Sequence, residues 1–181
     1  MLVGLSACAD GGGSMGRPSA VRNANLGEPR IYRLGPGDKV KIVVFGEADL
    51  SGNFDVAASG QIAMPLVGDI PAKGLSPAAL KDAITRRLSE GYLKHPKVSV
   101  EVLTYRPIFV HGEVKTGGEL AFKHGLKVRD AIAVAGGYTY RANQNYILLN
   151  RDGEASEIRV DLPSDLIIMP GDNIRVPERF F

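Results

Sequence analysis

The sequence contains a single cysteine, Cys8, no tryptophan and three histidines. One cysteine excludes an intramolecular disulfide framework and a thiolate metal cluster. The histidines, His95, His111 and His124, do not have the spacing of paired zinc ligands, so we expect each of them on the surface or at a strand edge. We therefore expect neither a metal site nor a cofactor.

An excess of charge of one sign is also lacking, because 22 lysine and arginine residues stand against 20 aspartate and glutamate residues. The two signs are well mixed, without the clustered basic face that is typical of nucleic-acid-binding proteins. We therefore expect no nucleic-acid partner. No apolar run approaches the roughly 20 residues that a membrane-spanning helix needs.

Motifs of catalysis are missing as well. No Gly-x-Ser-x-Gly nucleophile elbow occurs, and residues 11–14 (Gly-Gly-Gly-Ser) are not followed by the Lys-Ser/Thr of a phosphate-binding loop. The Gly136-Gly137 pair ends a predicted helix instead of starting one. Carboxylates are scattered singly, with no evident acid–base pair for glycoside cleavage. The sequence therefore predicts a protein that is not an enzyme.

Glycine and proline are plentiful, at 22 and 11 residues, which suits many turns and short strands. Two stretches share one pattern: residues 36–38 and 170–172 both read Pro-Gly-Asp, and an alternating apolar segment follows each. Proline and glycine favour the central positions of a type II turn, and the aspartate can accept backbone N–H groups at the turn exit. We interpret Asp38 and Asp172 as turn caps, not as catalytic acids.

The first residues are small and apolar and end in Leu5-Ser6-Ala7-Cys8, which resembles a bacterial lipoprotein box. Only seven residues precede Cys8, and no basic segment opens the chain, so either translation starts upstream of Met1 or the match is coincidental. The Gly/Ser/Asn/Ala-rich stretch that follows is typical of a flexible tether. We expect residues 1–29 to be a signal remnant and tether, with lipidation at Cys8.

Residues 30–104 are predicted to form a small α/β domain with one main helix. Alternation predicts a strand over 39–45, and Ser59-Gly60 predicts a hairpin turn between short strands. Residues 46–54 form a polar stretch that contains glycine and shows no strand or helix pattern. Ser76 and Pro77 begin a helix whose stripe is Leu80, Ile84 and Leu88, and Gly91 ends it. A further strand over 98–102 completes a small mixed sheet.

Residues 105–178 are predicted to form a second small domain beyond a joint at 105–107. We expect a strand over 108–114, a helix over 127–135 with a weak cap at Lys127, and strands at 146–149, 157–160 and 173–176. One helix among several strands suits a β-grasp arrangement. The fold class predicted for the whole chain is α+β, with two small domains.

The ordered motifs at 32–38, 60–68 and 95–100 resemble the bacterial polysaccharide biosynthesis/export family, the auxiliary proteins of capsule and exopolysaccharide secretion. The motifs at 110–114, 131–137 and 169–176 resemble the soluble-ligand-binding β-grasp (SLBB) domain that follows in this family. The resemblance spans residues 31–177. It implies a polysaccharide as cargo and a structural role as a ring conduit.

The resemblance also implies partners and a location. Family members form homo-oligomeric rings in the periplasm and work with an inner-membrane polysaccharide copolymerase, often linked to a tyrosine kinase. Larger members add a C-terminal amphipathic helix that crosses the outer membrane, and the sequence up to Phe181 shows no such helix. We therefore expect anchoring to the outer membrane through Cys8 and a separate outer-membrane barrel. The alternative is a soluble periplasmic module that binds a glycan or another ligand.

Overall fold

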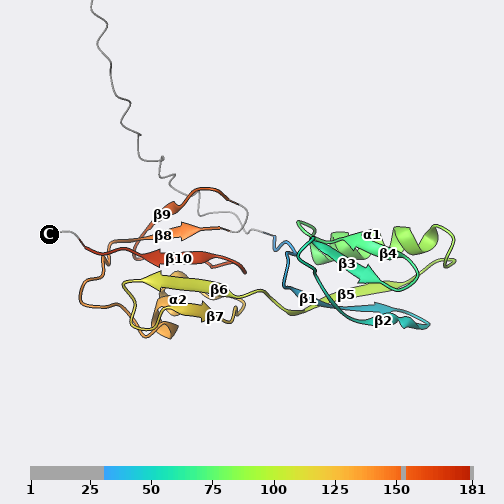
Figure 1. The fold of residues 1–181 in the computed structure, drawn as a ribbon, viewed down its shortest axis with the longest axis horizontal. Coiled ribbons are helices and arrows are strands. Elements are labelled where there is room, and N and C mark those ends of the chain that lie inside the picture. The colour runs from blue at the N-terminus through green and yellow to red at the C-terminus, as the bar shows by residue number, and fades with distance from the viewer. Residues whose placement is uncertain (1–30, 152–153, 180–181) are drawn as a thin grey trace, which may run out of the picture.

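The computed structural model describes residues 31–151 and 154–179, which form an elongated α+β structure with two hydrophobic cores (Figure 1). The first core lies within residues 34–102, and the second within residues 108–176. A connection through Tyr105, Arg106 and Pro107 joins the two halves. The predicted α+β class is confirmed. Among the described residues, no helix is both long and apolar enough to cross a membrane.

The first half is built on a three-stranded antiparallel sheet in the order β2-β1-β5. Its central strand β1 (Lys39–Val44) alternates strictly, with Val40, Ile42 and Val44 buried as predicted. The other strands of this sheet are β2 (Glu47–Asp55) and β5 (Val98–Thr104). A separate hairpin of β3 (Gln61–Met64) and β4 (Gly68–Pro71) adds side chains to the same core.

Helix α1 (Pro77–Ser89) covers this core as the sequence predicted. The Ser76 hydroxyl accepts a hydrogen bond from the Ala79 backbone N–H at 3.1 Å, and Pro77 takes the first helical position, where no N–H is needed. The stripe of Leu80, Ile84 and Leu88 is fully buried. Burial of each such side chain contributes about 1.5–3 kcal/mol, which fixes α1 on the sheet.

The first half differs from the sequence analysis at three points. The sheet is antiparallel throughout, not mixed. The polar stretch, to which no element was assigned, is strand β2, an edge strand in which only Leu50 is buried, so it has no apolar alternation to detect. Gly60 does lie in a turn, with a φ of 82°, and the Ala57 N–H donates to the Gln61 carbonyl across it, but the strand that pairs with β3 is β4.

The second half is a five-stranded mixed sheet in the order β7-β6-β10-β8-β9. Its first strand, β6 (Ile108–Gly112), runs parallel to the last, β10 (Asn173–Val176), and all the other pairs are antiparallel. The remaining strands are β7 (Gly118–Leu120), β8 (Tyr146–Asn150) and β9 (Ile158–Asp161). A central parallel pair with one helix on the sheet agrees with the predicted β-grasp arrangement. The short edge strand β7 was not predicted.

Helix α2 (Val128–Val134) buries Val128, Ala131 and Ile132 against this sheet. Its cap differs from the serine or threonine type, because the Asp130 carboxylate reaches back to accept the Lys127 backbone N–H at 3.1 Å. Gly136 and Gly137 follow with φ values of 79° and 83°, a conformation that ends the helix at little cost for glycine.

The predicted tether of residues 1–29 and the proposed lipidation site Cys8 lie outside the described residues.

Candidate functional site

The first Pro-Gly-Asp turn is organised by Asp38, which is completely buried. Its Oδ2 atom accepts the Gly35 backbone N–H at 2.7 Å, so the aspartate caps its own turn. The capped N–H lies three residues before the aspartate, at the turn entrance, and not at the exit as the sequence suggested. The interpretation of Asp38 as a turn cap is therefore confirmed, with this correction.

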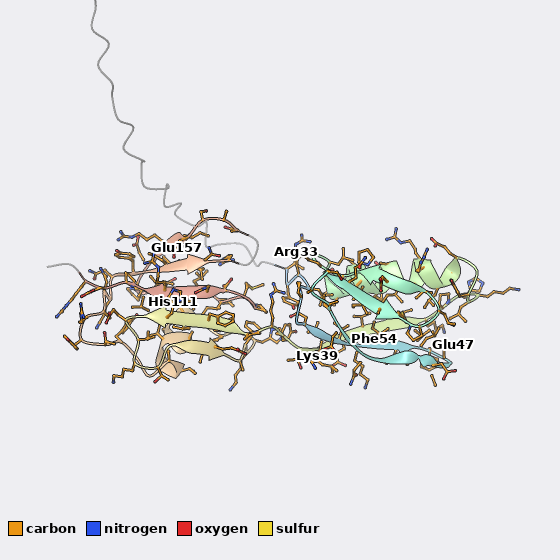
Figure 2. The ribbon with its side chains drawn as sticks, viewed as in Figure 1. Arg33, Lys39, Glu47, Phe54, His111 and Glu157 are labelled. Atoms are coloured by element: carbon orange, nitrogen blue, oxygen red, sulfur yellow. The ribbon has the colours of Figure 1, made fainter. Side chains whose placement is uncertain are left out.

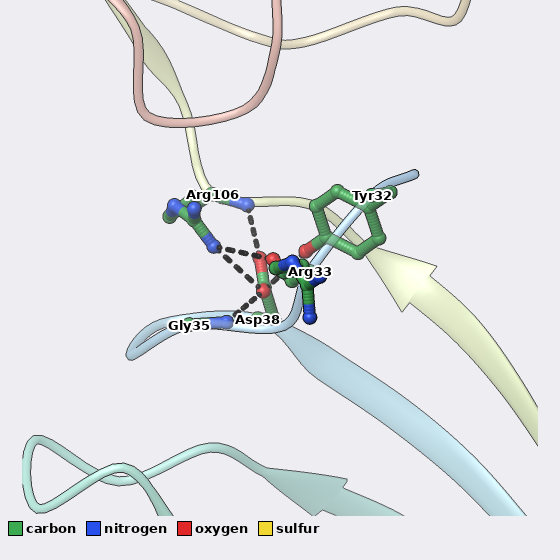
Figure 3. Close-up of polar contacts among 5 residues, drawn as sticks. All are labelled: Tyr32, Arg33, Gly35, Asp38 and Arg106. Atoms are coloured by element: carbon green, nitrogen blue, oxygen red, sulfur yellow. Dashed lines mark hydrogen bonds and ion pairs between the residues drawn. The ribbon is translucent and has the colours of Figure 1, made fainter. Parts of the chain in front are cut away.

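The same carboxylate also binds the connection between the two halves (Figure 3). Asp38 Oδ1 accepts the Arg106 backbone N–H at 2.8 Å, and Oδ2 pairs with Arg106 Nη1 at 3.0 Å. The Tyr32 hydroxyl donates to Oδ2 as well. Burial, and then the hydrogen bond to this carboxylate, raise the pKa of Tyr32 far above its ordinary value, so the phenol stays protonated and remains a donor.

The second Pro-Gly-Asp turn holds the next residue of the same connection. Asp172 Oδ2 accepts the Met169 backbone N–H at 2.8 Å, repeating the cap of the first turn. The Gly171 backbone N–H then donates to the Pro107 carbonyl at 3.0 Å, and Phe109 N–H donates to the Asp172 carbonyl. Two turns that lie far apart in the sequence therefore fix adjacent residues, Arg106 and Pro107. We call residues 105–107 the joint.

Aromatic rings extend the joint into both halves. Tyr105 packs edge-to-face on Tyr32 of the first half, with 4.9 Å between ring centroids. It makes similar contacts with Phe122 and His124 of the second half, at 5.3 and 4.8 Å. The Tyr105 hydroxyl lies 2.7 Å from His124 Nε2, within hydrogen-bond distance. Rings from both halves therefore pack against Tyr105 of the joint.

The remaining charged groups in the second half mostly form surface pairs. Arg175 on β10 holds Glu157 through both of its carboxylate oxygens, and this hydrogen bonding, aided by the nearby His111, lowers the pKa of Glu157 (Figure 2). Arg159 Nε donates to Asp161 at 2.9 Å. In the part of the chain that the structure describes, no group of three or more His, Cys, Asp or Glu side chains is placed to hold a metal ion.

A hollow of about 350 Å³ opens beside α2. Arg129 of the helix, Tyr138 and Gln144 of the α2–β8 connection, and residues 162–165 of the β9–β10 connection line it. The β9–β10 connection is held against the start of α2, because Val128 N–H donates to the Leu166 carbonyl and Ile168 N–H to the Leu126 carbonyl. The hollow is thus framed by backbone hydrogen bonds.

The three histidines are exposed, as expected for surface positions. Four polar or aromatic residues of the α2–β8 connection lie in different surroundings. Tyr138 lines the hollow, Tyr140 is 84% exposed, Arg141 pairs with Glu178, and Asn143 caps a local turn.

Comparison with known families identifies both halves of the chain. The polysaccharide biosynthesis/export protein family matches residues 27–103, and the SLBB domain matches residues 106–176. Residues 27–103 therefore belong to the polysaccharide biosynthesis/export family, and residues 106–176 form an SLBB domain. The resemblance seen in the sequence is confirmed, and the joint lies at the boundary of the two matches.

Individual relatives support the same family. The chain is 32% identical over 166 residues to the exopolysaccharide production protein ExoF of Rhizobium meliloti, an alignment that covers 82% of this chain and 39% of the relative. It is 29% identical to the polysialic acid transport protein KpsD of Escherichia coli over 55% of this chain and 18% of the relative.

A third relative is the capsule polysaccharide export outer membrane protein CtrA of Neisseria meningitidis, 27% identical over 66% of this chain and 30% of the relative. The chain thus spans about two-fifths or less of the length of these curated relatives.

Sequence reasoning found the two turns and their aspartates but missed the joint's main contacts. Asp38 and Arg106 are 68 residues apart, and no local spacing connects them. The available signal was indirect: the pattern Tyr-Arg-Pro at 105–107 marked the connection, and the duplicated turn marked the two segments that bind it.

Proposed function

We propose that this export-family protein is a structural component of a capsular polysaccharide or exopolysaccharide export channel. It is a periplasmic protein, anchored to the outer membrane by a lipid on Cys8. Copies of the chain form a ring through which the polymer passes. The chain performs no chemical turnover, and its contribution is to hold the wall of the conduit in a fixed shape.

The observation that carries this proposal is the match of both halves, in this order, to the export family and the SLBB domain. The names of the relatives describe exopolysaccharide production, polysialic acid transport and capsule polysaccharide export. The joint supports a structural role, because a buried ion pair, two capped turns and a group of packed rings hold the two halves together. A subunit with a fixed shape suits a ring wall.

The proposed partners follow from the route of the polymer. An inner-membrane polysaccharide copolymerase, in some systems linked to a tyrosine kinase, delivers the chain into the ring. A separate outer-membrane barrel completes the passage to the outside.

The first test is a strain that lacks this protein, assayed for polymer in the medium, on the cell surface and inside the cell. The proposal expects exported polymer to vanish and wild-type protein supplied in trans to restore it. Cys8→Ser in a full-length gene should restore export poorly, with the protein released from the membrane fraction. Unchanged export in the deletion strain, in the absence of a paralogue, would contradict the proposal.

A second candidate function is a soluble periplasmic module that binds a glycan, and the hollow beside α2 favours it. The two candidates differ in oligomeric state. Light scattering of the detergent-extracted protein should show a large, uniform assembly if the chain forms a ring. A stable monomer at all concentrations would favour the binding module.

A further inference from the structure

We infer that the hollow beside α2 is a binding subsite for an acidic sugar unit, with Arg129 as the group that recognises its carboxylate. The inference rests on the proposed function, since it assigns a contact point for the polymer that the protein would pass.

The size and composition of the hollow suit a sugar. Its volume of about 350 Å³ lies at the lower end of the range of ligand pockets, roughly 300–1,000 Å³. Leu162 and Pro163 offer an apolar surface for the C–H face of a ring, while Gln144 and Ser164 offer polar groups for hydroxyls. Ser164 Oγ accepts the Leu166 N–H at 3.1 Å, which leaves its own hydrogen to donate to a ligand.

Arg129 is held in a way that leaves its guanidinium open to a ligand. Its side chain is 68% exposed, and its contacts with the carboxylates of Asp130 and Asp165 are both at 3.8 Å. These separations permit electrostatic attraction but exceed the length of a hydrogen bond. A carboxylate on a bound sugar can therefore take two parallel N–H donors from the guanidinium, the geometry in which arginine binds carboxylates most strongly.

The surrounding charges favour one negative charge over two. Asp165 is neutralised by Lys127, whose Nζ lies 2.7 Å from Asp165 Oδ1, and that hydrogen bond, with Arg129 contributing less, lowers the pKa of Asp165. The local sum of Lys127, Arg129, Asp130 and Asp165 is zero. Both carboxylates oppose any added anion, and this repulsion grows with the charge of the anion, so a singly charged sugar carboxylate is favoured over a doubly charged phosphate. The hydroxyls of the sugar can then use the neutral partners.

The test is a calorimetric titration of the full chain with trigalacturonate, and with maltotriose as the neutral oligosaccharide of equal length. We expect trigalacturonate to bind and maltotriose to bind at least about tenfold more weakly, the change expected when a hydrogen-bonded charge is lost. Arg129→Gln should weaken trigalacturonate binding by a similar factor. Arg129→Lys should weaken it too, because lysine lacks the planar fork.

The matched control is Arg86→Gln, which removes the same charge from an exposed position on α1. It should leave the affinity unchanged, and the Tm of both variants should stay close to wild type, since both side chains are exposed. Equal affinity for maltotriose, no binding of trigalacturonate, or equal losses in Arg129→Gln and Arg86→Gln would each overturn the inference.

The result of the titration can be told apart from the result of the deletion-strain test of the proposed function. If the deletion strain loses export while the purified chain fails to bind trigalacturonate, only the subsite is wrong. If the deletion strain exports normally, the proposed function fails whatever the titration shows.

Discussion

Asp38 is the residue on which the joint depends most. It is fully buried, and its carboxylate accepts hydrogen bonds from Gly35, Tyr32 and Arg106 at the same time. Asp38→Asn would remove the charge opposite Arg106, and breaking one partner of a buried pair costs about 3–5 kcal/mol. We expect a loss of roughly 3 kcal/mol in the free energy of unfolding, measured by urea denaturation, because asparagine keeps one acceptor oxygen.

Asp55→Asn is the control for this substitution. Asp55 also pairs with a cation, Lys39 at 3.4 Å, but its side chain is 70% exposed, so its loss should cost no more than about 1 kcal/mol. Equal effects of the two substitutions would show that the buried carboxylate contributes no more than a surface one.

The pair of Glu157 and Arg175 predicts a pH dependence of stability. The pKa of Glu157 is lower in the folded protein than in the unfolded chain, so the pair stabilises the fold above the ordinary carboxyl pKa of about 4.3. That contribution is lost as the pH falls through the folded-state pKa. Glu157→Gln should therefore lower the Tm at pH about 7 and have little effect at a pH well below both pKa values.

Calorimetric Tm values at the two pH extremes check this. Glu101→Gln, at an exposed position of β5, should change the Tm little and equally at both. A Glu157→Gln effect that persists undiminished in acid would mean that the glutamate acts through packing and not through its charge.

At the scale of single residues, sequence reasoning identified local roles and missed distant partners. Asp38, Ser76 and Asp172 were recognised because a cap acts within a few residues of its own position. Arg106 was recognised only as part of a connection. Its role requires the first turn and the start of the second half to meet, and that meeting is decided by the packing of two cores.

At the scale of elements, Gly112 at the end of β6 shows how closely two strands approach. A Cβ atom at this position would lie 2.2 Å from the Val176 carbonyl oxygen of β10, and the φ of 88° already disfavours other residues. Gly112→Ala should destabilise the protein by about 1–2 kcal/mol for the backbone conformation. The clash with the neighbouring strand should add roughly another 2 kcal/mol.

Gly46, in the turn between β1 and β2, separates the two effects. Its φ is 86°, nearly that of Gly112, but nothing lies within 4 Å of the position of its Cβ. Gly46→Ala should therefore show the backbone cost alone when both variants are compared by urea denaturation. If the two variants lost the same free energy of unfolding, the close approach of β6 and β10 would add nothing to the cost of Gly112→Ala.

Elements with a buried face were predictable, and those without one were not. The alternation of β1 and the stripe of α1 gave strong signals because their apolar side chains form the first core. Strands β2 and β7 lie at sheet edges, with few or no buried side chains, and exist because a neighbour supplies backbone hydrogen bonds. Such strands leave little trace in the hydrophobic pattern.

At the scale of the whole molecule, the joint predicts that the two halves keep one relative orientation in solution. Domains joined by a short connection usually move relative to one another unless their interface holds them. Tyr105 lies between Tyr32 and the Phe122–His124 pair, and each aromatic contact contributes about 0.5–1.5 kcal/mol. Tyr105→Ala removes these contacts together with the hydrogen-bond partner of His124. We expect the two halves to reorient in this variant.

Residual dipolar couplings measure this directly. A single alignment tensor should fit both halves of the wild-type protein, whereas Tyr105→Ala should need a separate tensor for each half. Tyr92→Ala, which removes a half-exposed ring just after the C-terminal end of α1, is the control and should still fit one tensor. A single tensor for Tyr105→Ala would mean that the turns alone fix the orientation. Separate tensors in the wild type would remove the physical basis for a rigid ring wall, because each subunit could then no longer set the diameter of a passage.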